Sequence, residues 1–131
     1  MPAQIHRLLQ RGSLALALAP GLALAWLLAA TPPAYAHAIL VEASPAAGAT
    51  VSGPDLGVRL RFNARIDGPR SRLTLVRPNH EEQALTLDKQ AAPAVLTGKL
   101  TGLTPGAYRL RWQVLAADGH ITRGEVPFQV K

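Results

Sequence analysis

An alternation of apolar and polar residues with a period of two runs through the chain after residue 37. Segments 56–62, 108–114 and 126–130 place apolar residues at every second position, and most residues between them are polar or small. This period is typical of a β-strand with one face in a core and one face in water. No stretch shows a convincing helical period, so the alternation predicts an all-β fold.

Shorter candidate strands and turn signals complete the pattern. The shorter candidates are segments 38–42, 72–76, 84–87 and 95–100. Segments rich in proline, glycine and asparagine separate the strands, at 44–48, 67–69, 77–79 and 104–106. About seven short strands with this spacing predict an antiparallel Greek-key β-barrel or sandwich. Tyr108, Trp112 and Phe128 are expected to supply much of its core, because aromatic side chains bury the most area per residue.

The first 36 residues have the order of features found in a secretory signal peptide. Arg7 and Arg11 give a positive start, residues 14–30 form an apolar run, and Ala34-Tyr35-Ala36 provides a small-x-small cleavage site. The alternative is a membrane anchor, but a run of about 17 residues is at the lower limit for spanning a bilayer. Pro20-Gly21 would also break a helix near its middle. We therefore expect cleavage after Ala36 and export to the periplasm.

The predicted mature chain, residues 37–131, has the size of one small domain. It contains no cysteine, and the only methionine of the chain is Met1, so both sulfur ligands are missing from it. Of the 14 Lys and Arg residues, Arg7 and Arg11 precede the cleavage site, and with 8 Asp and Glu the mature net charge is +4. This charge suggests an anionic membrane surface or an acidic partner before a nucleic acid, although an ordinary solvated surface also explains it. Two outward basic stripes are expected, Arg59 with Arg61 and Arg109 with Arg111.

His37 would become the first residue of the mature chain. Its free α-amine and its imidazole Nδ1 can then close on one metal ion as a chelate. In the precursor the same nitrogen is an amide, which is a poor metal ligand. Cleavage is therefore predicted to create a metal site, and cleavage at a neighbouring position would remove it.

Asp118 and His120 stand two residues apart between the two strongest strand candidates. In an extended segment both side chains project to the same side. The alternative interpretation is a plain Asp-Gly hairpin turn followed by a histidine without a role. Together with His37 these residues offer four nitrogen and oxygen donors, which suit Cu(II) and which Zn(II) would also accept. His80 lies in a predicted surface loop and is interpreted as a solvated side chain.

Five motifs along the mature chain carry a family resemblance. They are His37-Ala38-Ile39-Leu40, Ser44-Pro45-Ala46-Ala47-Gly48, Gly106-Ala107-Tyr108-Arg109-Leu110-Arg111-Trp112, Ala117-Asp118-Gly119-His120 and the closing segment 124–130. Their combination resembles the CopC family of periplasmic copper-binding proteins. The resemblance implies a seven-stranded Greek-key β-barrel similar to cupredoxins, with Cu(II) held by the amine and Nδ1 of His37, by Asp118 and by His120. It also implies a CopD-type inner-membrane copper transport protein as a partner.

Two departures from the family pattern refine this expectation. Some members carry a methionine-rich Cu(I) loop, and the comparable region here, roughly residues 77–94, has no methionine. The chain therefore resembles the Cu(II)-only type. Some members also carry a glutamate shortly after the phenylalanine of the second strand, whereas Phe62 is followed here by Asn63-Ala64-Arg65.

The sequence predicts a monomeric copper-binding protein that is not an enzyme and that serves copper buffering, resistance or delivery. One alternative is a copper oxygenase, which also holds copper by an N-terminal histidine and a second histidine. That chemistry needs an open equatorial position, and Asp118 would fill it. A second alternative is an exported β-sandwich for adhesion or assembly, which would bind no Cu(II) stoichiometrically.

Overall fold

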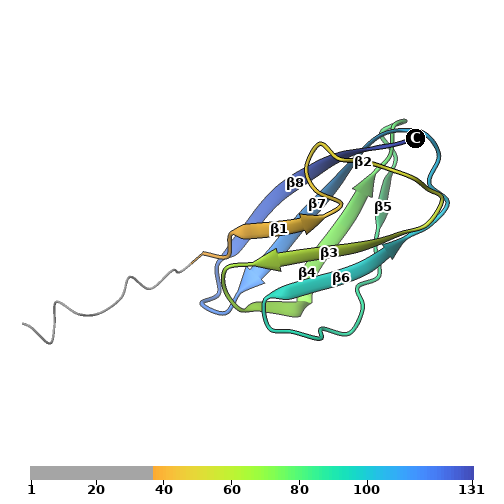
Figure 1. The fold of residues 1–131 in the computed structure, drawn as a ribbon. Coiled ribbons are helices and arrows are strands. Elements are labelled where there is room, and N and C mark those ends of the chain that lie inside the picture. The colour runs from red at the N-terminus through yellow and green to blue at the C-terminus, as the bar shows by residue number, and fades with distance from the viewer. Residues whose placement is uncertain (1–36) are drawn as a thin grey trace, which may run out of the picture. The chain divides into compact units, whose positions relative to one another are not determined.

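The computed structural model describes residues 37–131, which form two β-sheets packed on one another (Figure 1). The predicted signal peptide, residues 1–36, lies outside the described residues. Among residues 37–131 we find no helix with the length and apolar character that a membrane crossing requires. The strands are β1 (Leu40–Ser44), β2 (Thr50–Val51), β3 (Leu56–Phe62), β4 (Ile66–Val76), β5 (Glu82–Ala84), β6 (Val95–Leu100), β7 (Gly106–Ala116) and β8 (Ile121–Val130).

The strands divide into a three-stranded sheet in the order β1-β3-β6 and a five-stranded sheet in the order β2-β8-β7-β4-β5. All neighbouring strands are antiparallel except β2 and β8, which pair in parallel over two residues. The chain passes from one sheet to the other at every connection except β4–β5 and β7–β8, which gives the crossed connections of a Greek key. The predicted all-β fold is confirmed. The additional strand β2 is too short to produce an alternation that could be recognised.

The core lies between the two sheets and is built by the alternation. Every second residue of β7 from Tyr108 onward is buried. Tyr108 stacks on Phe128 with ring centroids 5.5 Å apart, and Phe62 meets the ring of Trp112 edge-on at 5.2 Å. The three aromatic residues predicted for the core are all buried there.

The start of β4 corrects one predicted turn. Segment 67–69 lies inside β4, where the register with β7 is irregular. Asp67 Oδ1 accepts a hydrogen bond from the Arg70 N–H at 3.1 Å, and the Asp67 carbonyl accepts one from the Ser71 hydroxyl at 2.6 Å. These local bonds replace ladder bonds, so the chain bulges within a strand instead of turning. Because β4 begins at Ile66, it extends to the β7–β8 turn.

The predicted strand 84–87 was wrong in its bounds. β5 ends at Ala84, and the following residues cross from the five-stranded sheet to the three-stranded sheet. The N–H of Leu85 donates to the Leu73 carbonyl of β4 at 2.9 Å, and the N–H of Asp88 donates to the Thr97 carbonyl of β6 at 2.9 Å. This crossing segment closes one side of the sandwich.

The four arginines predicted to form basic stripes do point outward, but each one is paired with a glutamate. The ion pairs are Arg59–Glu42 at 3.3 Å, Arg61–Glu42 at 3.0 Å, Arg109–Glu125 at 3.3 Å, Arg111–Glu125 at 3.3 Å and Arg111–Glu82 at 2.6 Å. Their charge is therefore largely compensated on the sheet surface itself.

Candidate metal centre

His37, Asp118 and His120 come together at one end of the sandwich. Each residue offers a ligand atom, and these atoms all lie within 4.8 Å of one another. The imidazole rings of His37 and His120 have centroids 4.9 Å apart. The structure thus brings together the three residues that the sequence singled out, although His37 lies far from the other two in the sequence.

The β7–β8 turn positions two of the three residues. The strands pair up to Leu115 and Ile121, and the Ala116 N–H donates to the His120 carbonyl at 2.8 Å. Gly119 has φ +88°, a left-handed conformation that glycine adopts without strain. The expected Asp-Gly turn is therefore present, and it also carries the two polar side chains.

Hydrogen bonds from distant residues fix the segment that carries His37. Ala38, the next residue, is buried in the core, and its carbonyl accepts a hydrogen bond from Thr122 Oγ1 at 2.9 Å. Asn63 holds Ile39 from both sides: Asn63 Oδ1 accepts from the Ile39 N–H at 2.7 Å, and the Asn63 N–H donates to the Ile39 carbonyl at 2.9 Å. We call these three bonds the N-terminal clamp. Sequence analysis missed the roles of Asn63 and Thr122.

The carboxylate of Asp118 is bound on both oxygens by His120. Oδ1 accepts a hydrogen bond from the His120 backbone N–H at 3.0 Å, and Oδ2 lies 2.9 Å from Nδ1 of the same imidazole. The backbone hydrogen bond lowers the pKa of Asp118 below its ordinary value; desolvation opposes this, and the imidazoles of His120 and His37 add to the lowering. Asp118 is therefore an anion at neutral pH.

This donor set fits a borderline divalent ion. Two imidazoles and a carboxylate suit Cu(II) in a tetragonal arrangement and Zn(II) in a tetrahedral one. The imidazole of His120 is 61% exposed, so an ion can reach it without opening the fold. The contact between Asp118 and Nδ1 of His120 also has the form of a carboxylate that orients a metal-binding imidazole.

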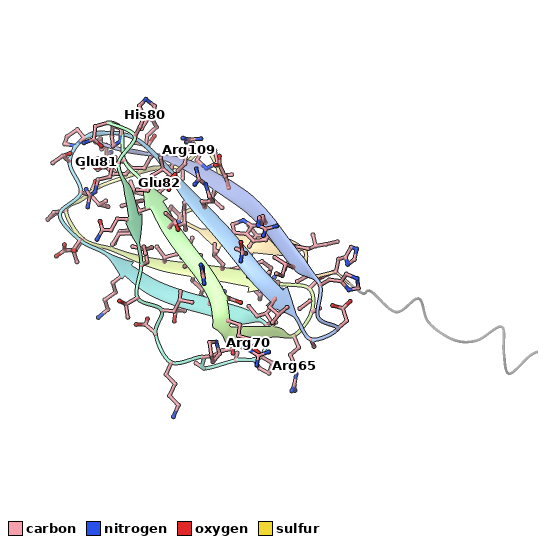
Figure 2. The ribbon with its side chains drawn as sticks, turned by 180° about the vertical axis from the view of Figure 1, so that it is seen from behind. Arg65, Arg70, His80, Glu81, Glu82 and Arg109 are labelled. Carbon is pink, nitrogen blue, oxygen red and sulfur yellow. The ribbon has the colours of Figure 1, made fainter. Side chains whose placement is uncertain are left out.

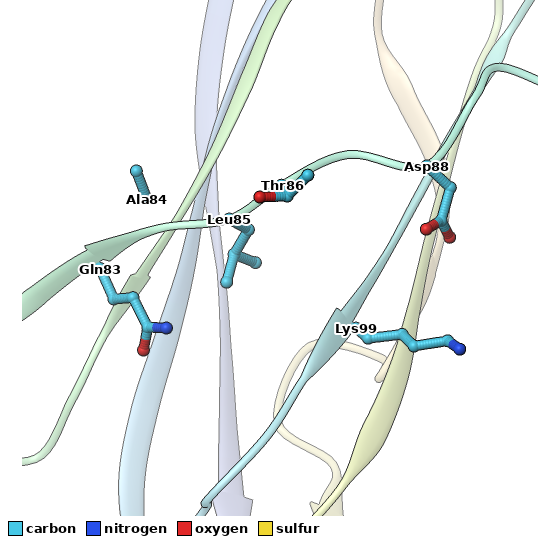
Figure 3. Close-up of a pocket in the computed structure, with 6 residues that line it drawn as sticks. All are labelled: Gln83, Ala84, Leu85, Thr86, Asp88 and Lys99. Atoms are coloured by element: carbon cyan, nitrogen blue, oxygen red, sulfur yellow. The ribbon is translucent and has the colours of Figure 1, made fainter.

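Other polar features of the described residues do not form a comparable site. His80 lies in the turn between β4 and β5, at the opposite end of β4, and does not belong to the metal-binding group. A shallow hollow of about 340 Å³ is lined by polar and aliphatic side chains of β5, the crossing segment and β6 (Figure 3). Its Asp88 and Lys99 are the only charged side chains in that lining, and they carry opposite charges.

Comparisons with known proteins give a domain family and a similar protein. Residues 40–131 match the CopC domain family. Copper resistance protein C of Xanthomonas campestris pv. juglandis is 35% identical over 111 residues, which cover 78% of this chain and 86% of that protein.

Two solved structures share the fold. The crystal structure of CopC from Methylosinus trichosporium OB3b is 31% identical with a TM-score of 0.65, over 72% of this chain and 94% of that chain. PcoC, a methionine-rich copper resistance protein from Escherichia coli, is 24% identical with a TM-score of 0.56, over 72% of this chain and 99% of that chain. At this lower identity the PcoC likeness shows the fold alone.

Proposed function

The chain belongs to the CopC domain family, and from this premise we propose that it is a periplasmic Cu(II)-binding protein. In this proposal residues 1–36 are a signal peptide that export removes. The mature protein, residues 37–131, buffers copper as a monomer or delivers it to a membrane copper transporter of the CopD type. The likeness to copper resistance protein C supports copper as the cargo.

The convergence of His37, Asp118 and His120 carries the proposal. Their ligand atoms lie within 4.8 Å of one another, and all are nitrogen or oxygen donors. Such donors favour Cu(II), whereas Cu(I) prefers thiolate and thioether sulfur. The chain has no cysteine, and its one methionine, Met1, precedes the proposed cleavage site.

Each side chain has a distinct task in this proposal. His37 would bind through its amine and Nδ1, His120 through an imidazole nitrogen, and Asp118 through a carboxylate oxygen. A fourth donor at Asp118 closes the equatorial plane, which favours holding copper over oxygen chemistry and so argues against the oxygenase alternative. The high exposure of the site suits the exchange of copper with a partner.

The experiment that tests the proposal compares the protein beginning at His37 with the same protein extended by one alanine before His37. Competition titration with a Cu(II) chelator and electron paramagnetic resonance are the readouts. We expect the authentic protein to bind one Cu(II) much more tightly and to give a different spectrum. Equal affinities and identical spectra would show that the amine is not a ligand. Absence of stoichiometric Cu(II) binding in both proteins would refute the copper function.

A second measurement tests the oxidation state. The copper-loaded protein is reduced with ascorbate in the presence of a Cu(I)-specific chelator. We expect reduction to release the metal, because no sulfur ligand is available after cleavage. Retention of copper under these conditions would contradict the proposed ligands.

A further inference from the structure

Exposed aliphatic side chains lie close in sequence to the candidate metal ligands. The large hydrophobic residues exposed among residues 37–131 are Ile39 at 55%, Val41 at 47% and Ile121 at 49%. Ile39 and Val41 follow His37 on the way into β1, and Ile121 directly follows His120. The bond between Thr122 and the Ala38 carbonyl ties the two segments together. We call these three side chains the apolar rim.

Arginines without an acidic partner lie beside this rim. Arg72, Gln113 and Arg123 occupy one cross-strand row on the outer face of β4, β7 and β8, and Arg123 Nε donates to Gln113 Oε1 at 2.8 Å. Ile121 lies two residues from Arg123 on the same face, about 7 Å along the strand. Arg65 precedes β4, and its carbonyl accepts the Ala117 N–H in the β7–β8 turn.

None of these three arginines forms an ion pair among residues 37–131, in contrast to the four arginines paired with Glu42, Glu82 and Glu125. We call Arg65, Arg72 and Arg123 the rim arginines. Figure 2 shows Arg65 and Arg70 at one end of the sandwich, and Glu81, Glu82 and Arg109 at the other. Arg70 differs from the rim arginines because it lies 3.8 Å from Asp67. Uncompensated positive charge therefore adjoins the exposed aliphatic residues.

We propose that this end of the sandwich docks on an anionic phospholipid surface. The apolar rim enters the interfacial layer, and the rim arginines contact lipid phosphates. Guanidinium groups recognise phosphate through paired hydrogen bonds, and each basic residue near an anionic membrane strengthens binding about fivefold. Docking in this orientation would hold the metal centre against the membrane, where a membrane transporter takes its cargo.

The shape of this surface favours lipid over the acidic face of a protein. The aliphatic residues of the rim line neither of the two surface hollows described for residues 37–131, although Arg65 lines one of these hollows. Side chains that protrude separately, next to arginines, suit a fluid surface that requires no shape complementarity.

The test is co-sedimentation of the metal-free protein, beginning at His37, with vesicles. One set contains equal parts of phosphatidylethanolamine and phosphatidylglycerol, and the other contains phosphatidylcholine alone. We expect binding to the anionic vesicles only, and weaker binding as salt is raised. The double variant Arg72→Gln/Arg123→Gln should lower the partition coefficient about 25-fold, at about fivefold for each arginine. Ile121→Ser should also weaken binding.

The matched control is Arg59→Gln/Arg61→Gln, which removes the same charge from the opposite sheet. We expect it to retain most of the binding. An equal loss in both double variants would show that net charge alone acts, and would overturn the proposal. No binding of the original protein to anionic vesicles would also overturn it and would leave an acidic protein as the occupant. Because the assay contains no copper, its failure is distinct from failure of the proposed function.

Discussion

The two ends of β4 and β7 carry similar residues with different outcomes. At one end, His120 follows Asp118 in the β7–β8 turn and lies beside His37. At the other end, His80 precedes Glu81 and Glu82 in the β4–β5 connection, again a histidine beside carboxylates in a tight turn. The ligand atoms of the first set converge, whereas His80 belongs to no such group among residues 37–131.

The difference arises from what a third segment does at each end. At the candidate metal centre the N-terminal clamp holds the residues after His37 against β8 and the end of β3. At the opposite end, Glu82 is engaged by Arg111, and the turn is closed by its own backbone, with the His80 N–H donating to the Arg77 carbonyl at 2.9 Å. A histidine next to an acidic residue in a turn therefore does not by itself form a group of converging ligand atoms. A segment distant in the sequence must supply a further donor.

The largest expected effect contrasts the histidines of the two ends. His120→Ala should lower Cu(II) affinity by more than about 100-fold, because loss of a direct ligand should exceed the 10- to 100-fold cost typical of outer-shell changes. His80→Ala should leave the affinity unchanged. Competition titration of both variants measures the contrast, and circular dichroism verifies that each is folded. Comparable losses in both variants would contradict the assignment of copper to the end that carries His120.

A smaller effect separates two roles of Asp118. Asn at this position can still accept a hydrogen bond but carries no charge, whereas Ala removes both. If the carboxylate is a ligand, Asp118→Asn and Asp118→Ala should each lower Cu(II) affinity, by about 10- to 100-fold. Titration at neutral pH is appropriate, because the lowered pKa keeps Asp118 ionised there. Retention of affinity in the Asn variant alone would show that Asp118 acts only by orienting His120.

Much of this arrangement could be predicted from the sequence because it depends on local patterns. The alternation in β3, β7 and β8 revealed the strands, and the spacing of Asp118 and His120 revealed two candidate ligands. The turn predicted at residues 67–69 was wrong. Hydrogen bonds to the side chain and the backbone carbonyl of Asp67 stabilise a bulge inside β4 instead.

The N-terminal clamp could not be predicted from local patterns in the sequence. Asn63 acts on a residue 24 positions away, and Thr122 acts on one 84 positions away. A single sequence gives no indication of which segments meet across the fold. For the same reason the prediction of two basic stripes did not include their glutamate partners, which lie on neighbouring strands.

A third prediction addresses the clamp directly. Thr122→Val keeps the size of the side chain but removes the donor to the Ala38 carbonyl. One such hydrogen bond contributes about 1 kcal/mol, so Cu(II) affinity should fall about fivefold. Electron paramagnetic resonance should show a second copper environment, and Thr122→Ser should restore the original spectrum. Thr97→Val is the control, because the Thr97 hydroxyl makes no hydrogen bond among residues 37–131. An unchanged spectrum in Thr122→Val would mean that the clamp does not position His37.

The smallest effect is expected at the end without the metal centre. Glu82→Gln removes the charge that pairs with Arg111, and both side chains are about half exposed, at 54% and 41%. Exposed pairs contribute at most about 1 kcal/mol, and Arg111 keeps Glu125 as a partner, so the free energy of unfolding in urea should fall by less than that. Cu(II) affinity should not change, because β7 separates this pair from the turn that carries Asp118. A folded variant with altered Cu(II) affinity would show that the two ends are energetically coupled through β7.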